Sequence, residues 1–159
     1  MQSNILEKIK KQYEPLKKKY KLPEFSKLNE EFEIEKIQEK ETEFILREIR
    51  RAMSEKIAAC LRFFEMLVNP QLTPLFLLSS LKNLTLREKE IIEKIYRELA
   101  QLELEAVKLD ISYNESKEAK AILQIMEKWQ ELKTEMEEII SVLELKHKET
   151  EKRNKTYFG

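Results

Sequence analysis

Residues 34–68, IEKIQEKETEFILREIRRAMSEKIAACLRFFEMLV, decide the fold of this chain. Their apolar side chains recur mostly every three or four positions, which is the spacing of one buried face of an α-helix. At 1.5 Å per residue, a helix over 34–68 would reach about 50 Å. Asn69 and Pro70 end it, because the residue before a proline avoids the α-helical region. The stretch therefore predicts one long helix with a buried face.

Two capping boxes predict where two further long helices begin. In such a box a Ser or Thr hydroxyl and a Glu carboxylate, three residues apart, satisfy free N–H groups at a helix start. The first, TLRE at 85–88, opens a helix over 86–111. The second, SYNE at 112–115, opens a helix over 113–147. Beyond it the apolar face stops, so we expect 148–159 to fray.

The stretches on either side of the 34–68 helix are predicted to be shorter elements. Residues 1–21 form a basic helical arm, which Pro15 kinks or divides into two short helices. Residues 22–33 form a linker, and three of its apolar side chains pack as a plug: Phe25, Leu28 and Phe32. After the long helix, Thr73 is the expected N-cap of a short apolar helix with Pro74 at its first position.

The composition favours a helical, soluble protein. The chain has 159 residues, 30 Lys and Arg against 30 Asp and Glu, and one Gly. Scarce glycine disfavours sheets with tight turns and glycine-rich phosphate loops. Together the patterns predict a single all-α domain over 1–159, an elongated, coiled-coil-like bundle of three long helices with the arm and the short helix. No apolar run is long enough for a membrane span, and no signal peptide is evident, so we expect a cytoplasmic protein. Heavy use of Glu and Lys is typical of heat-adapted proteins.

Periodicity also predicts the core. We expect it to contain the following residues: Ile45, Ile49, Met53, Ile57, Cys60, Phe64, Ile92, Ile95, Leu99, Leu102, Ile122, Met126, Trp129 and Ile140. Cys60 is interpreted as a small buried apolar residue and not as a nucleophile, because no base or helix N-terminus is near it in the sequence.

The inventory of catalytic residue types is thin. One His, one Cys and one Asp do not assemble an ordinary catalytic triad or a zinc site. Glu144 and His147 have the Glu-x-x-His spacing of di-iron bundles, but those sites need a second such motif, so a solvated histidine is favoured. We therefore predict no enzyme activity, no cofactor and no metal. A metal-dependent enzyme built on Glu and His147 is the least favoured alternative.

Two basic clusters are candidates for an interaction with phosphate or carboxylate groups. Arg47, Arg50 and Arg51 lie within five positions, and pairing with glutamates of the same helix is the simpler explanation for them. The arm contributes its lysines to the second cluster, above all Lys17, Lys18 and Lys19. These lysines either contact nucleic acid or dock on the acidic 24–43 segment.

The short apolar helix is the candidate protein interface. Its consecutive apolar side chains do not all fit into one interior, so they are enclosed on every side or exposed as an interface. With neighbours they form a dense patch: Leu72, Leu75, Phe76, Leu77, Leu78 and Leu81. The patch either forms the interface of a homodimer or caps one end of the bundle in a monomer. The homodimer is slightly favoured. The preferred function is therefore a non-enzymatic interaction or scaffold protein with an unidentified protein partner. A nucleic-acid-associated factor that uses residues 8–21 and 47–51 is the alternative.

Several stretches carry resemblances to known proteins. KYKLPEFSKLNEEFEIEKI, FILREIRRAMSEKI, KNLTLREKE and the ending KTYFG resemble a group of small archaeal all-helical proteins, which implies an archaeal source but no function. Over about 44–104, the segment Arg47 to Arg51 and the box at Asn83, Thr85 and Glu88 resemble the helical domain of GINS subunits. That second resemblance implies a scaffold role in a replicative helicase assembly. The small β domain that GINS subunits carry has no counterpart here.

Overall fold

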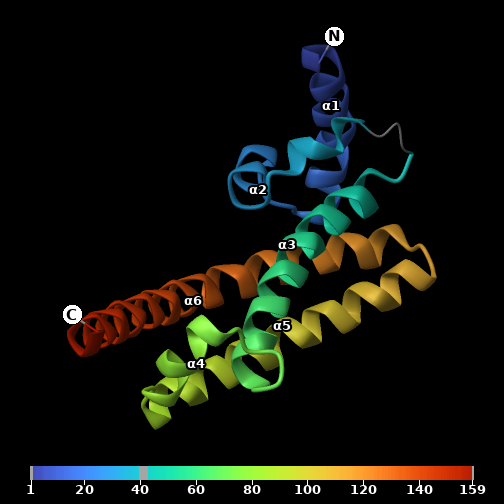
Figure 1. Ribbon diagram of the computed structural model, residues 1–159. Coiled ribbons are helices and arrows are strands. Elements are labelled where there is room, and N and C mark those ends of the chain that lie inside the picture. The colour runs from blue at the N-terminus through green and yellow to red at the C-terminus, as the bar shows by residue number, and fades with distance from the viewer. Residues whose placement is uncertain (1, 40–42, 159) are drawn as a thin grey trace. The chain divides into compact units, whose positions relative to one another are not determined.

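The protein is described from a computed structural model, which covers residues 2–39 and 43–158. In chain order, its elements are α1 (Gln2–Tyr20), α2 (Phe25–Phe32), the 3₁₀-helix η1 (Ile34–Glu39), α3 (Ile45–Val68), α4 (Leu75–Lys82), α5 (Leu86–Ile111) and α6 (Glu115–Phe158) (Figure 1). All elements in the two described ranges are helical, which confirms the all-α prediction there.

The chain divides into two compact units. Unit 1 combines Met1–Ala59 with Gln101–Lys128, and unit 2 combines Cys60–Ala100 with Trp129–Gly159. Unit 1 therefore contains α1, α2 and η1 with the first part of α3, the last part of α5 and the first part of α6. The remainder of these three long helices and all of α4 belong to unit 2.

The N-terminal arm is one continuous helix, so of the two predicted alternatives the division into two short helices is wrong, and the kink stays a prediction. Pro15 lies inside α1. Helix α1 ends at Tyr20. The next residue, Lys21, has a left-handed φ of 54°, and the Leu22 N–H donates to the Lys17 carbonyl at 3.0 Å. This is the Schellman pattern, which satisfies carbonyls at a helix C-terminus. Lysines in the last turn also complement the negative end of the helix dipole.

Residues 22–33, which were predicted to form a linker, contain helix α2. The expected plug is confirmed, because Phe25, Leu28 and Phe32 are all buried. The fully buried Tyr13 of α1 joins them: its hydroxyl donates to the Pro23 carbonyl at 2.7 Å, and its ring lies edge-on to the Phe25 ring. Burial raises the pKa of Tyr13, and the carboxylates of Glu24 and Glu14 add to that shift.

The long helix begins at Ile45 and not at residue 34. Ahead of it, Glu33 takes a left-handed φ of 52° and its N–H closes α2 on the Asn29 carbonyl, so the chain cannot run straight into a helix. Ile34 and Ile37 are still buried, but on the 3₁₀-helix η1, which packs against α1. A spacing of three places side chains on one side of a 3₁₀-helix as well as of an α-helix, which explains the overextended prediction. Residues 40–42 of the predicted helix lie outside the described residues.

The first capping box is confirmed and the second is wrong. Thr85 Oγ1 accepts the Glu88 N–H at 3.2 Å, and Glu88 Oε2 accepts the Thr85 N–H at 2.7 Å, as a capping box requires. At the start of α6 the cap is Asn114, whose Oδ1 accepts the Lys117 N–H at 3.0 Å. Asn is as good an N-cap as Ser, and it lies directly before the first helical residue, so it takes the place predicted for Ser112.

Thr73 also has a different role from the predicted one. Helix α4 begins at Leu75 without a side-chain cap, and Pro74 is its N-cap residue. The Thr73 hydroxyl instead donates to the Met66 carbonyl at 2.6 Å and lies 3.1 Å from the Asn69 carbonyl. It therefore satisfies the C-terminal end of α3, which stops before Asn69 and Pro70 as predicted.

The predicted frayed tail is helical, because α6 continues to Phe158. Its side chains over 151–157 are exposed, so no apolar face holds this part of the helix. The residues are mostly Glu, Lys and Arg, which have high helix propensity and do not need burial to favour a helix. The hydroxyls of Thr150 and Thr156 add bonds to the carbonyls four residues earlier, at 2.9 and 3.0 Å.

The predicted core is confirmed with two exceptions. Among the described residues, Cys60 is only half-buried and Ile140 is 41% exposed, whereas the other expected core residues are buried. Adjacent apolar residues on a helix point about 100° apart, so only one of Ile139 and Ile140 can face inward, and it is Ile139. Trp129 is buried as expected.

We predict that Trp129→Ala lowers the free energy of unfolding by about 3–5 kcal/mol, because it leaves a large cavity in unit 2. Ile140→Ala is the matched control on the same helix and should cost less than about 1 kcal/mol, since most of the effect of truncation comes from burial. Urea denaturation followed by circular dichroism measures both values. Equal losses for the two variants would show that Trp129 is not a core residue.

Candidate functional site

A buried ion pair links α3 to α6 in unit 1. The Arg50 guanidinium and the Glu118 carboxylate are 1% and 0% exposed. Arg50 Nε donates to Glu118 Oε2 at 2.7 Å, and Arg50 Nη2 donates to Glu118 Oε1 at 3.2 Å. Two parallel N–H···O bonds of this kind are the strongest geometry available to an arginine and a carboxylate.

The pair belongs to a larger cluster, which also includes the end of α5. Asp110 Oδ1 accepts from Arg50 Nη2 at 2.7 Å and from Arg51 Nε at 3.1 Å. Arg47 donates to the Leu109 carbonyl at 2.8 Å, and its Nε lies 3.5 Å from Glu118 Oε1. The cluster therefore joins three helices through one set of charged hydrogen bonds.

The charges in the cluster stabilise one another. Burial disfavours the charge on Arg50, but hydrogen bonds to Glu118 and Asp110 outweigh it and raise the pKa of Arg50. Burial likewise acts to raise the pKa of Asp110, but hydrogen bonds from Arg50 and Arg51 outweigh it and hold that pKa below its ordinary value. Both shifts favour the charged forms of Arg50 and Asp110.

The arginines do occur together, as predicted, but their partners are mostly on other helices. Within α3, Arg51 pairs with Glu48 at 3.3 Å. The main acceptors for the arginines are Asp110 on α5 and Glu118 on α6. Sequence reasoning missed both acceptors. Asp110 could have been singled out from the sequence, because it is the single Asp in the chain. Glu118 could not, because it is one of many glutamates. Arg50 is 1% exposed, and its Nε and Nη2 already donate to carboxylates, so it is poorly placed to bind an external phosphate.

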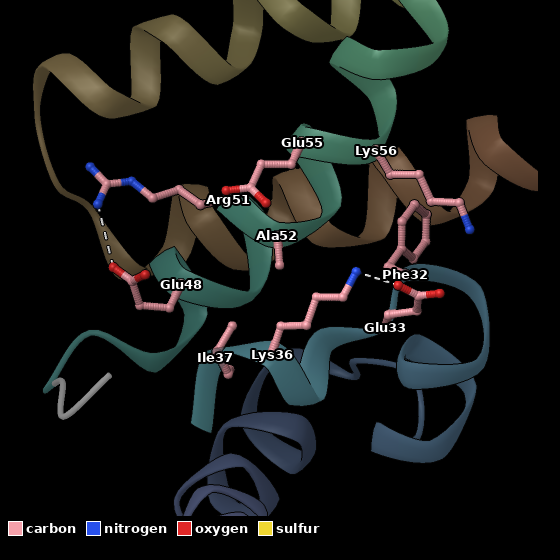
Figure 2. A pocket seen from close by; sticks show the side chains of 9 residues that line it. All are labelled: Phe32, Glu33, Lys36, Ile37, Glu48, Arg51, Ala52, Glu55 and Lys56. Carbon is pink, nitrogen blue, oxygen red and sulfur yellow. Dashed lines mark hydrogen bonds and ion pairs between the residues drawn. The ribbon is translucent and has the colours of Figure 1, made fainter. Parts of the chain in front are cut away.

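A cavity of about 420 Å³ lies beside the cluster, between α3, η1 and the end of α2 (Figure 2). Its cations have partners in the chain: Lys36 pairs with Glu33, Arg51 pairs with Glu48, and Lys56 donates to the Glu31 carbonyl and lies over the Phe32 ring. The cavity is lined by Phe32, Glu33, Lys36, Ile37, Glu48, Arg51, Ala52, Glu55 and Lys56. Acidic and basic side chains are equal in number, so the lining favours neither an anion nor a cation.

The lysines of the arm are only partly free. Lys17 pairs with Glu14 at 3.0 Å and with Glu24 at 2.9 Å, so one lysine does dock on the acidic segment as predicted. Lys19 pairs with Glu115 at the start of α6, whose Oε1 also accepts the Tyr20 hydroxyl at 2.7 Å. These two hydrogen bonds, the one from Tyr20 first, lower the pKa of Glu115. Lys18 is exposed.

His147 and Cys60, the single His and the single Cys of the sequence, both belong to unit 2. The His147 ring is partly exposed, lies 6.0 Å from the Phe76 ring, and has its Nε2 3.6 Å from Glu151. Cys60 is half-buried and is not part of a disulfide. Within residues 2–39 and 43–158, no three His, Cys, Asp or Glu side chains gather as a metal-binding set. The same residues include no helix with both the length and the hydrophobicity that a membrane crossing needs.

Helix α4 presents apolar side chains to solvent. Leu75 is 87% exposed and Phe76 60% exposed, and Leu72 just before the helix is half exposed. Leu77 points inward and is buried, while Leu78 is half-buried. The patch predicted from the sequence thus separates into an anchoring residue and an outward apolar surface, which we call the α4 surface: Leu72, Leu75 and Phe76.

Comparison with known proteins identifies no relative. No family model, curated protein or solved structure matches the chain. The resemblances to archaeal helical proteins and to GINS subunits therefore stay predictions.

We predict that Arg50→Met lowers the free energy of unfolding by about 3–5 kcal/mol, because it leaves Glu118 charged, buried and without its main partner. The double variant Arg50→Met, Glu118→Leu should recover most of this loss, since both charges then leave the interior. Arg62→Met, at an exposed position of α3, is the control and should change little. Denaturant titrations of the four proteins provide the values. A double variant less stable than Arg50→Met would contradict this explanation.

The lowered pKa of Asp110 predicts a specific dependence on pH. A carboxylate whose pKa is depressed by folding stabilises the protein above its unfolded pKa of about 3.9. That contribution is lost as the pH falls through the lower, folded value. The stability difference between the native protein and Asp110→Asn should therefore be constant from about pH 5 to 7 and shrink toward about pH 2. Thermal unfolding at several pH values tests this, and a difference that grows in acid would have the wrong sign.

Proposed function

We propose that this chain is a non-enzymatic protein-interaction or scaffold protein whose α4 surface docks a protein partner. The observation that carries the proposal is the outward position of Leu75 and Phe76 on a helix whose neighbouring Leu77 anchors it to unit 2. Large exposed apolar side chains that gather on one element are typical of protein interfaces. Aromatic side chains in particular are enriched at the centre of interfaces.

The other observations agree with this proposal. In the charged cluster of unit 1, Arg50 already donates to Glu118 and Asp110, and the cavity beside the cluster has balanced charges. A nucleic-acid-associated factor was the alternative from the sequence. It receives less support, because Arg50 is buried and Lys17 and Lys19 already pair with carboxylates. It and the metal-dependent enzyme stay predictions.

We predict that Leu75→Glu, Phe76→Glu abolishes partner binding and leaves the fold intact. Glutamate in the first turn of a helix complements its dipole, so α4 should persist and the melting temperature should change by less than about 2 °C. Affinity capture from the organism that encodes the chain, read by mass spectrometry, should recover partners with the native protein and lose them with this variant.

Two controls make that experiment decisive. Ile140→Glu introduces the same charge at an exposed apolar position of unit 2 outside α4, and it should capture the same partners as the native protein. Leu77→Glu buries a charge and should unfold unit 2. If the double variant is folded and still captures every partner, the α4 surface is not the docking site.

A further inference from the structure

A second apolar face lies on α5, in unit 1. Leu104, Val107 and Ile111 are 61%, 49% and 80% exposed. Their spacing of three and then four residues places them on one stripe of the helix. Leu102 and Ala106, on another side of the same helix, are buried and hold α5 in the unit. The stripe, defined as Leu104, Val107 and Ile111, is thus an exposed face of a helix whose core-facing side is already occupied.

On one side of the stripe, a groove of about 360 Å³ between α3 and α5 contains unpaired acceptors. Glu55 and Glu103 make no ion pair with any described side chain. Glu103 Oε2 and Ser54 Oγ are buried and have no hydrogen-bond partner among the described residues. Arg50 and Arg51 also line this groove, but the carboxylates of the charged cluster already bind them. We name this the acidic groove. Buried polar atoms normally have a hydrogen-bond partner, so its unsatisfied groups indicate a donor from outside the unit.

On the other side of the stripe, a groove of about 240 Å³ between α5 and α6 contains unpaired cations. Lys108, Lys117 and Lys120 line it, are exposed, and make no ion pair with a described side chain. Glu105 is the one acidic residue of the lining, and its Oε1 accepts a hydrogen bond from Gln101. We call this the basic groove. The stripe is therefore bordered by free charges of opposite sign.

We propose that this face binds a second copy of the chain, with the two α5 helices parallel and the two-fold axis running along them. An axis in that direction exchanges the two sides of the stripe. The acidic groove of each copy then faces the basic groove of the other, and the exposed lysines of one copy lie opposite Glu55 and Glu103 of the other. In an antiparallel two-fold pair, the two acidic grooves would instead face each other, and so would the two basic grooves. Like charges placed opposite each other are unfavourable.

A second copy fits this face better than other occupants do. A basic peptide or a small amine would occupy the acidic groove but leave the lysines of the basic groove unpaired. Only a partner with an apolar stripe between acidic and basic flanks satisfies all three parts, and this chain carries such a partner itself. The stripe covers only about 11 Å of helix, so we expect a transient dimer that weakens as salt is added.

Cysteine cross-linking tests the orientation. In a background of Cys60→Ala, Leu104→Cys and Ile111→Cys are prepared separately. In a parallel pair each new thiol meets its own counterpart, so each variant should form an interchain disulfide by itself, more readily at low salt. In an antiparallel pair, Leu104 would face Ile111 of the other copy. Cross-linking that requires a mixture of the two variants, or no cross-linking at all, would overturn the proposal.

Charge exchange tests the contribution of the grooves. Glu103→Lys and Lys120→Glu should each weaken self-association about tenfold or more in analytical ultracentrifugation, because each sets like charges opposite one another. The two changes together should restore most of the affinity. Glu93→Lys, on an exposed part of α5 in unit 2, should have no effect. A native chain that stays monomeric at high concentration and low salt would contradict this proposal.

This inference extends the proposed function, since it names one partner of a scaffold protein, but it uses a different surface. The two can fail separately. A monomeric chain that still captures partners through the α4 surface contradicts only the α5 dimer. A dimer that forms through α5 while the α4 variant captures the same partners as the native chain contradicts only the α4 surface.

Discussion

The buried pair of Arg50 and Glu118 is the constraint on which unit 1 depends. A charge inside a protein is tolerated only where hydrogen-bonded partners of opposite charge compensate for the water that it loses. Glu118 and Asp110 provide those partners for Arg50, so the start of α3, the end of α5 and the start of α6 must meet at one place. Arg47 adds to the same junction through the last carbonyls of α5. Glu115, one turn before Glu118, then binds Tyr20 and Lys19 of α1.

The helical class could be predicted from the sequence because periodicity, proline positions and the scarcity of glycine all point the same way. The box at Thr85 and Glu88 was predicted correctly, since nothing nearby competes with it. The start of α6 was not, because Ser112 and Asn114 are both good caps and the sequence alone does not rank them. The start of α3 was misplaced because a buried 3₁₀ turn has apolar residues at the same spacing as an α-helix.

The site was harder to predict than the fold. Clustering of three arginines was visible, but their acceptors lie about 60 positions further along the chain and depend on how the helices meet. Among so many glutamates, nothing in the sequence distinguishes Glu118, which is fully buried, from its exposed neighbours. The apolar run in α4 was recognised, yet only the structure separates buried Leu77 from exposed Phe76. The exposed apolar face on α5 was not predicted, because helical periodicity identifies the buried side of a helix and does not show which other apolar residues stay uncovered.

The left-handed conformations of Lys21 and Glu33 have a consequence for the unfolded chain. Most proteins place glycine after a helix in such positions, because a side chain makes this conformation cost about 1–2 kcal/mol. Glycine, however, adds freedom to the unfolded chain, and each one avoided stabilises the folded state by about 0.4–1 kcal/mol when the native backbone tolerates a side chain. A chain with a single glycine, at its last position, therefore has an unusually stiff unfolded state. Local strain at two helix ends is offset by the smaller loss of backbone entropy along the rest of the sequence.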